Sequence, residues 1–439
     1  MDGFGIDGRW AMPSRDHSDF VIIGAGAAGL MAARELARSG KKVTLLEARD
    51  RCGGRIDSLP AKEFGYPAEG GAEFVHGASA VTRGLMRDAG LSLSPSTGKG
   101  WRAADGVLSP SDGKTPHAAR FHQALSALTA DLPLSEFLAK HFAGPHYADL
   151  RRSILRMVEG FDAADPNRAS TFALREEWMS RGLGQQGRIA EGYGALIAFL
   201  VSECRQHGAA IHLGAVVTAI EGTRGGMTAR CRDGRTFSAD AVILTVPLPL
   251  LAEIALPPRA RAEADAASEI GYGNVVKILL RFDTNWWSGG GGRNLADMSF
   301  LFSNAAVPTW WTQHPTPHSV LTGWLAGPKS DAVARLSADD LVAVGLRSLA
   351  EIFTIPEDRL RARLVAARAI NWGNDPFARG AYSYATPKTR EAQSRLGKAS
   401  SGVLFSGEAL YAGPEMGTVE AALASGLETA RAILSTWKT

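Results

Sequence analysis

The chain has 439 residues, 45% of them apolar and 21% charged, which is typical of a globular protein large enough for two domains. Its formal charge of +3 is nearly balanced and its basic residues are spread along the chain, so the charge pattern argues against nucleic-acid binding. Three cysteines without a C-x-x-C spacing argue against a metal site and suit a reducing compartment. Without an apolar leader or membrane-length run, we expect a cytoplasmic protein with no membrane partner.

The first patterned segment lies between residues 19 and 47. An apolar run at 20–23 predicts a strand, and apolar residues at helical spacing predict a helix that ends at Ser39 and Gly40. The run at 41–47 predicts a second, buried parallel strand. Together they predict a βαβ unit.

The remaining elements alternate in type along the chain. Residues 85–205 are mainly helical in pattern, with periodic stretches at 122–138 and 190–204. Strands are predicted at 210–213, 216–220, 241–246 and 275–282. From 283 to 395 short apolar runs alternate with turns, and the chain closes with a strand at 403–405 and a helix at 419–434.

A glycine-rich turn joins the first strand to the first helix. Gly24, Gly26 and Gly29 would let a pyrophosphate approach the amides of the helix N-terminus, where the helix dipole is positive. Glu47 ends the second strand, where a carboxylate accepts hydrogen bonds from ribose hydroxyls. The unit therefore predicts binding of NAD or FAD rather than NADP, although a purely structural turn has the same pattern.

Four further segments resemble the flavin-containing amine oxidase family, which includes monoamine oxidases, polyamine oxidases and the flavin-dependent histone lysine demethylase. Residues 47–55 (EARDRCGGR) and 70–77 (GGAEFVHG) are similar to its first FAD segments, and 404–408 (LFSGE) and 417–422 (GTVEAA) to its last. The resemblance implies FAD as the cofactor. Glycines let the backbone lie close to this flat group, and arginines at 51–55 neutralise its phosphates.

The resemblance also implies particular FAD contacts. Val217 would touch the adenine, Trp372 the flavin, Glu408 the ribityl chain or pyrophosphate, and the helix starting at Val419 the O2 edge of the flavin. The complete implied set is Gly24, Gly26, Ala28, Gly29, Glu47, Ala48, Arg49, Gly54, Arg55, Gly71, Ala72, Glu73, Phe74, Val217, Trp372, Gly407, Glu408, Gly417, Thr418 and Val419.

Three residues are implied as catalytic. Lys277 is similar to a family lysine that reaches a water at flavin N5, although a strand lysine is more often an edge charge. Tyr382 is similar to one aromatic wall of the amine site. His76 is similar to a histidine of animal polyamine oxidases near the substrate amine, and a loop histidine bonded to backbone is its alternative.

Departures from the family pattern shape the expected substrate site. Ala381 replaces the cysteine that tethers flavin in monoamine oxidases, so we expect non-covalent FAD. Pro414 replaces the second aromatic wall, leaving Tyr382 with Trp324 or Tyr411 to form the pocket. Phe74 and Val75 stand where amino-acid oxidases usually place an arginine, which disfavours α-amino acids. The tryptophan pairs at 286–287 and 310–311 are expected to serve packing.

We therefore expect an α/β fold in which a Rossmann-type FAD-binding domain is interleaved with an α+β substrate domain, as in amine oxidases and p-hydroxybenzoate hydroxylase. The FAD-binding segments are 18–84, 188–282 and 396–439, and the substrate segments are 85–187 and 283–395. The expected function is oxidation of a primary or secondary amine, polyamine-like chains included, to an imine by hydride transfer to flavin N5, with O2 as acceptor. A flavin desaturase or protoporphyrinogen-type oxidase, and a flavin-binding protein without amine turnover, are the alternatives.

Overall fold

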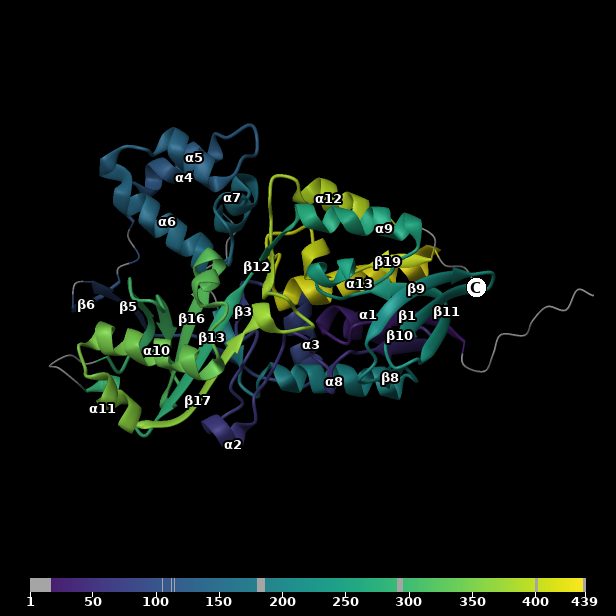
Figure 1. The fold of residues 1–439 in the computed structure, drawn as a ribbon, viewed down its shortest axis with the longest axis horizontal. Coiled ribbons are helices and arrows are strands. Elements are labelled where there is room, and N and C mark those ends of the chain that lie inside the picture. The colour runs from purple at the N-terminus through teal and green to yellow at the C-terminus, as the bar shows by residue number, and fades with distance from the viewer. Residues whose placement is uncertain are drawn as a thin grey trace, which may run out of the picture.

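The computed structural model describes residues 17–104, 106–111, 113, 115–179, 186–289, 295–398 and 402–436. Two large sheets dominate it and lie side by side, the first on the right of Figure 1 and the second on the left. The first sheet has the strand order β8-β2-β1-β11-β10-β9, and β19 pairs with β11. These strands are β8 (Ala210–His212), β2 (Val43–Leu46), β1 (Ser18–Ile23), β11 (Thr236–Leu244), β10 (Gly226–Cys231), β9 (Val217–Thr223) and β19 (Val403–Phe405).

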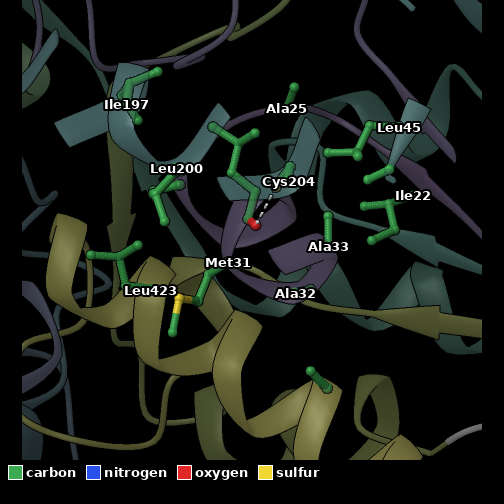
Figure 2. Packing of buried hydrophobic residues seen from close by; sticks show 14 of the residues in the cluster. Ile22, Ala25, Met31, Ala32, Ala33, Leu45, Ile197, Leu200, Cys204 and Leu423 are labelled. Carbon is green, nitrogen blue, oxygen red and sulfur yellow. Dashed lines mark hydrogen bonds between the residues drawn. The ribbon is translucent and has the colours of Figure 1, made fainter. Parts of the chain in front are cut away.

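The central strand β1 is buried on both faces, as a near-continuous apolar run predicts. Phe20 and Ile22 pack on one side, against α1 (Ala27–Arg38), α8 (Tyr193–Gln206) and α13 (Val419–Thr436). Figure 2 shows this core, in which Met31 of α1 lies near Leu423 of α13, and the Cys204 thiol donates to the Leu30 carbonyl at 3.4 Å. Helices α9 (Pro258–Ala264) and α12 (Thr389–Leu396) cover the opposite face.

The second sheet has the order β17-β13-β16-β15-β14-β5-β6. Its strands are β17 (Leu364–Asn371), β13 (Val275–Phe282), β16 (Val320–Ala326), β15 (Thr309–Trp311), β14 (Met298–Phe302), β5 (Lys99–Ala104) and β6 (Val107–Pro110). Helix α10 (Ala338–Phe353) buries its apolar stripe against this sheet, and α11 (Glu357–Ala362) follows it. A capping box between Ser337 and Asp340 fixes the start of α10.

A helical lobe stands beside the second sheet, in blue at the top of Figure 1. It consists of α4 (Ala118–Ser126), α5 (Leu134–His141), α6 (Ala148–Gly160) and α7 (Thr171–Met179), which share a core containing Phe121, Phe137 and Leu150. The smaller elements are α2 (Ala61–Phe64), α3 (Ala80–Asp88), the sheet of β3 (Val75–His76), β7 (Gln186–Ile189) and β4 (Leu93–Pro95), and the pair β12 (Gly271–Gly273) and β18 (Tyr382–Tyr384).

The predicted βαβ unit, the strand at 403–405 and the C-terminal helix are confirmed. Three expectations need correction. The helical stretch at 122–138 is two helices, because Pro133 precedes a new helix start at Leu134. The mainly helical segment 85–205 also holds strands β4 to β7, and segment 283–395 holds the long helix α10.

Strand β13 also departs from the expected layout. It lies between β16 and β17 in the second sheet, whereas the segment 188–282 was expected to belong to the FAD-binding domain. The strand that carries Lys277 is therefore central, and the edge-charge alternative for this lysine is wrong. The division into five domain segments stays a prediction.

Within the described ranges, no helix combines the length and apolarity that a membrane crossing requires. The same part of the chain holds no group of three or more histidine, cysteine, aspartate or glutamate side chains arranged to bind a metal ion.

Candidate active site

A cavity of about 1270 Å³ runs between the first sheet, the second sheet and the helical lobe. It is lined by residues from all parts of the chain, from the glycine turn after β1 to the N-terminus of α13. Every sequence-predicted site residue except Gly29 lines this one cavity. The fold thus brings together two glycine-rich segments that lie at opposite ends of the sequence.

The glycine turn has the shape that a pyrophosphate requires. Gly24 has φ +107°, and a Cβ there would lie 2.7 Å from the Thr245 hydroxyl oxygen. Gly29 faces away from the cavity, and a Cβ on it would lie 1.9 Å from the Gly24 carbonyl oxygen, so its role is close helix packing. Glu47 accepts the Ala25 amide at 2.8 Å, which anchors its carboxylate beside the cavity.

The opposite end of the cavity also fits FAD. The Arg55 guanidinium donates to Glu408 and to the Ala381 carbonyl, both at 2.8 Å, and so joins the first and last FAD segments. The second carboxylate oxygen of Glu408 is buried with no hydrogen-bond partner in the described structure. A buried acceptor without a hydrogen bond is energetically costly, so this oxygen would accept a hydrogen bond from a hydroxyl group of bound FAD.

Two other arginines behave differently from the expectation. Arg49 lines the cavity but forms a double hydrogen bond with Asp375, at 2.9 and 2.7 Å. Arg51 donates to the carbonyl oxygens of Gly54 and Ile56, and it does not line the cavity. The expectation that Arg51 neutralises the phosphates is therefore wrong, since its guanidinium stabilises the glycine loop instead.

Lys277 is fully buried, with an exposed fraction of 0%, and belongs to a charged network beneath the cavity. Its ammonium donates to Glu73 at 2.7 Å and to the Gly71 carbonyl at 3.1 Å. Glu73 also accepts from Arg188, Trp311 and Gln313. Burial alone would raise the pKa of Glu73, but Lys277 and Arg188 outweigh it and lower the pKa to about 2. The network fixes the ammonium beside the glycine segment at 70–71.

Comparison with known proteins decides the family. The model of the family described as flavin containing amine oxidoreductase matches residues 27–135 and 113–434. The chain belongs to this family. It is a flavin-dependent amine oxidase, an oxidoreductase acting on CH–NH or CH–NH2 donors, with FAD as its cofactor.

Individual relatives agree with this assignment. A probable polyamine oxidase 4 of Arabidopsis thaliana is 27% identical over 434 residues, which cover 89% of this chain and 82% of the relative. Among solved structures, cyclohexylamine oxidase from Brevibacterium oxydans IH-35A superposes with a TM-score of 0.78 at 20% identity, over 96% of this chain and 100% of that chain. Putrescine oxidase bound to putrescine gives 0.74 at 20% identity, over 95% and 99%. These two structures confirm the fold.

The walls of the amine site come from several elements of this amine oxidase. Tyr382 lies against Gly417, where a Cβ would be 3.2 Å from the ring, and its hydroxyl donates to the Phe161 carbonyl at 2.6 Å. Trp372 donates its indole N–H to the Gly70 carbonyl at 3.2 Å. Trp324 donates to the Gly160 carbonyl at 2.7 Å, which ties the second sheet to helix α6.

The remaining walls were only partly anticipated. The Tyr411 hydroxyl donates to Glu415 at 2.9 Å, and Pro414 also lines the cavity. Of the tryptophan pairs expected to serve packing, Trp310 is buried in the core of the second sheet, but Trp311 lines the cavity and binds Glu73. We expected both tryptophans of the pair to serve packing, but neighbouring residues of a strand face opposite sides of a sheet.

His76 lines the cavity and is surrounded by rings rather than by charges. Its ring centroid lies 5.4 Å from that of Phe161 and 5.9 Å from that of Phe74. Burial lowers the pKa of His76 to about 4, so the imidazole is neutral near pH 7. A neutral imidazole can accept a hydrogen bond from an amine or donate one to it.

Two acids in the cavity wall were not recognised in the sequence. Asp162 follows α6, Glu177 lies on α7, and a side-chain hydrogen bond links them next to Tyr382. Burial raises the pKa of Asp162 well above its ordinary value, and the neighbouring Glu177 raises it further. Burial likewise raises the pKa of Glu177, to about 7. No motif marks these residues, because the fold of the helical lobe alone brings them together.

Proposed function

We propose that this amine oxidase oxidises a primary or secondary amine that carries a second basic nitrogen, as polyamines do, to the corresponding imine. The proposal includes O2 as the electron acceptor and H2O2 as a product. The observation that carries it is the pair of hydrogen-bonded acids, Asp162 and Glu177, in the cavity wall beside Tyr382.

The pair has the charge that a second ammonium requires. Two carboxyl groups that share a hydrogen bond in a buried place keep one proton between them, because two adjacent negative charges repel each other. Because the pKa of Glu177 is raised to about 7, such a pair gains one negative charge as the pH rises through about 7. Facing a cavity from which water is partly excluded, this charge attracts one ammonium group more strongly than it would in open solvent.

Other residues would hold the reacting nitrogen. The Tyr382 ring forms a flat wall, and the neutral His76 is available for a hydrogen bond to an uncharged amine. FAD, when bound, supplies the acceptor for two electrons from the carbon next to the nitrogen. Lys277 holds a positive charge under the glycine segment at 70–71, where it favours the negative charge that develops during electron transfer.

The names of two similar proteins support the proposal. One curated relative is a probable polyamine oxidase, and one structure of similar fold is a putrescine oxidase with putrescine bound. Both names describe substrates with more than one basic nitrogen. The acidic pair gives this chain side chains that would recognise the same chemistry.

The substrate proposal has a direct test in the anaerobic reduction of the flavin by 1,4-diaminobutane and by butylamine. We expect the diamine to bind at least roughly tenfold more tightly, the gain expected from one buried charge pair. Asp162→Asn should remove most of this preference, whereas Asp358→Asn, an exposed aspartate on α11, should retain it. Equal binding of the two amines by the unmodified protein would contradict the proposal.

A carboxylate next to the amine should be disfavoured. Arg49 and Arg55, which line the part of the cavity that fits FAD, are each engaged by a carboxylate of the protein, so neither is free to pair with an α-carboxylate next to the flavin. Ornithine should therefore reduce the flavin more slowly than 1,4-diaminobutane, its decarboxylated counterpart. Faster reduction by ornithine would overturn this part of the proposal.

We further propose that FAD is held without a covalent bond, in a cytoplasmic enzyme. Ala381 replaces the tethering cysteine, and Cys204 and Cys231 are buried away from the cavity. Acid precipitation distinguishes non-covalent from covalent FAD, because FAD that is not covalently bound passes into the supernatant. Yellow colour that stays in the pellet would show that the alignment around Ala381 is wrong.

A further inference from the structure

A second hollow, of about 280 Å³, adjoins the active-site cavity and is lined by arginines from two elements. Arg102 comes from β5, and Arg152 and Arg156 come from α6. Asn304, which follows β14, and Asp149 also line it. Three guanidinium groups, one from β5 and two from α6, thus line one small volume.

Little in the described structure neutralises these charges. Arg102 forms no side-chain hydrogen bond or ion pair with any described residue, and Arg156 donates only to the neutral Asn304 amide oxygen, at 2.8 Å. Arg152 lies 3.5 Å from Asp149, and both side chains are exposed. Burial lowers the pKa of Arg156, and the like charges of Arg102 and Arg152 lower it further. Among the described residues, Asp149 is therefore the one carboxylate that faces these three arginines.

Some arginines elsewhere on the surface are instead paired with an acid. Arg230 donates to Glu221 at 2.8 Å and Arg363 to Asp283 at 3.0 Å, each forming an ordinary exposed ion pair. Guanidinium groups offer planar pairs of N–H donors that match the oxygens of a carboxylate or phosphate. A convergent group of them with few protein acceptors has the charge and the donors that an oxyanion needs.

We propose that Arg102, Arg152 and Arg156 form a binding site for an oxyanion, a carboxylate or a phosphate, at a solvent-exposed end of the substrate cavity. Arg102 and Arg156 line both the hollow and the main cavity. The anion therefore binds where the two spaces meet, and it is either free in solution or the acidic group at the far end of an amine.

Helix α6 connects this site to the amine site. Ser153, Arg156, Met157 and Gly160 all line the main cavity, at the spacing of one helix face. The four-residue step from Arg156 to Gly160 spans about 6 Å along the helix. Asp162 follows just beyond, so an extended ligand lying along α6 would meet a basic group at one end and an acidic pair at the other. An amine with a distant acidic group fits this polarity.

The first experiment tests the site without any turnover. The holoenzyme is titrated with inorganic phosphate and with glutarate by calorimetry at constant ionic strength. We expect at least one of them to bind, and Arg102→Gln and Arg156→Gln each to weaken that binding at least tenfold. Arg230→Gln, which removes an exposed arginine from an ion pair on β10, should leave it unchanged. Absence of binding, or equal binding by all variants, would overturn the proposal.

Folding of the variants can be checked independently. Arg102 is exposed and has no partner to lose among the described residues, so Arg102→Gln should keep the flavin content and melting temperature of the unmodified protein. This variant keeps the test decisive even where Arg156→Gln, which loses its bond to Asn304, fails to fold.

The second experiment identifies the source of the anion, and this arm rests on the proposed amine oxidation. It measures the ratio of kcat/KM for 6-aminohexanoate to that for hexylamine. A tenfold lower ratio in Arg102→Gln and Arg156→Gln assigns the site to the acidic end of an amine. An unchanged ratio, together with lost phosphate or glutarate binding, assigns it to a free anion. Absence of amine turnover would refute the proposed function and leave the calorimetric result valid.

Discussion

The two ends of the large cavity are built in different ways. The end that fits FAD is formed mainly by backbone, with glycines packed so closely that a single added Cβ would collide, as at Gly24 and Gly71. The end near the helical lobe is formed by side chains such as Asp162, Glu177 and Arg156. A cofactor of fixed shape requires a fixed backbone, whereas substrate choice depends on side chains that can change without disturbing the fold.

This contrast predicts that the largest effect will come from the backbone end. In Gly71→Ala the new Cβ would lie 1.9 Å from the Arg55 carbonyl oxygen, so the two segments that enclose the flavin must separate. We expect FAD affinity to fall at least roughly a hundredfold, because about 3 kcal/mol of strain is moderate for an enforced backbone clash. Flavin content after gel filtration and a fluorescence titration of the apoprotein would measure the loss.

Gly222→Ala serves as the matched control for this change. Gly222 lies on β9 with nothing within 4 Å of its would-be Cβ. The control should bind FAD like the unmodified protein. If Gly71→Ala does so too, the close packing of glycines is not what holds the cofactor.

The same contrast explains how far the sequence could predict the site. Gly24, Glu47, Glu408 and Val419 were recognisable because backbone requirements leave short motifs with fixed spacing. The helical lobe carries no such motif. Its two acids come from different places, one after α6 and one on α7, and meet only in the folded lobe. Apolar periodicity alone did not show that 122–138 contains two helices, although Pro133 marks the start of the second.

Lys277 was only partly predictable from the sequence. The family resemblance singled it out, but its partners could not be read from the sequence, since Glu73, Arg188 and Trp311 come from distant segments. The side chain of Glu73, expected as an FAD contact, is mainly engaged in holding Lys277 and Arg188. The place of Lys277 in the site was thus predictable from the sequence, but its hydrogen-bond partners were not.

The second prediction concerns this network. Lys277→Met removes the buried ammonium, and we expect flavin reduction or reoxidation to slow at least roughly tenfold, which corresponds to about 1.4 kcal/mol of transition-state stabilisation. Rapid-mixing measurements of both half-reactions would show which one responds. Lys388→Met, which breaks an exposed pair with Glu269, should change neither. Unaltered rates in Lys277→Met would confine this lysine to a structural role.

The third prediction uses the acids of the helical lobe. Burial raises the pKa of Glu177 from 4.5 to about 7, so between these values the unfolded chain loses a proton that the folded protein keeps. The contribution of Glu177 to stability is therefore present below about pH 4.5 and is lost as the pH rises to about 7. The melting temperature, relative to that of Glu177→Gln, should fall by roughly 2 °C or more across this window.

The exposed neighbour Glu176 provides the control for this measurement. It pairs with Arg390 at 2.9 Å, and Glu176→Gln should keep the pH dependence of the unmodified protein. A melting temperature that changes with pH in the same way in Glu177→Gln and in the unmodified protein would show that the acidic pair titrates outside this range.

The smallest effect is expected at His76, which lines the cavity between Phe74 and Phe161. With its pKa lowered to about 4, this imidazole is already neutral at working pH, so its loss should not change the shape of the turnover profile above about pH 6. His76→Ala should instead raise the KM for the amine roughly threefold, because a hydrogen bond to a neutral group contributes about 1 kcal/mol or less. His76→Gln, which keeps a donor and an acceptor, should recover part of the loss. A KM that is the same in all three proteins would leave His76 as part of the aromatic wall with Phe74 and Phe161, and a changed pH profile would show that the imidazole titrates nearer neutrality than its buried position implies.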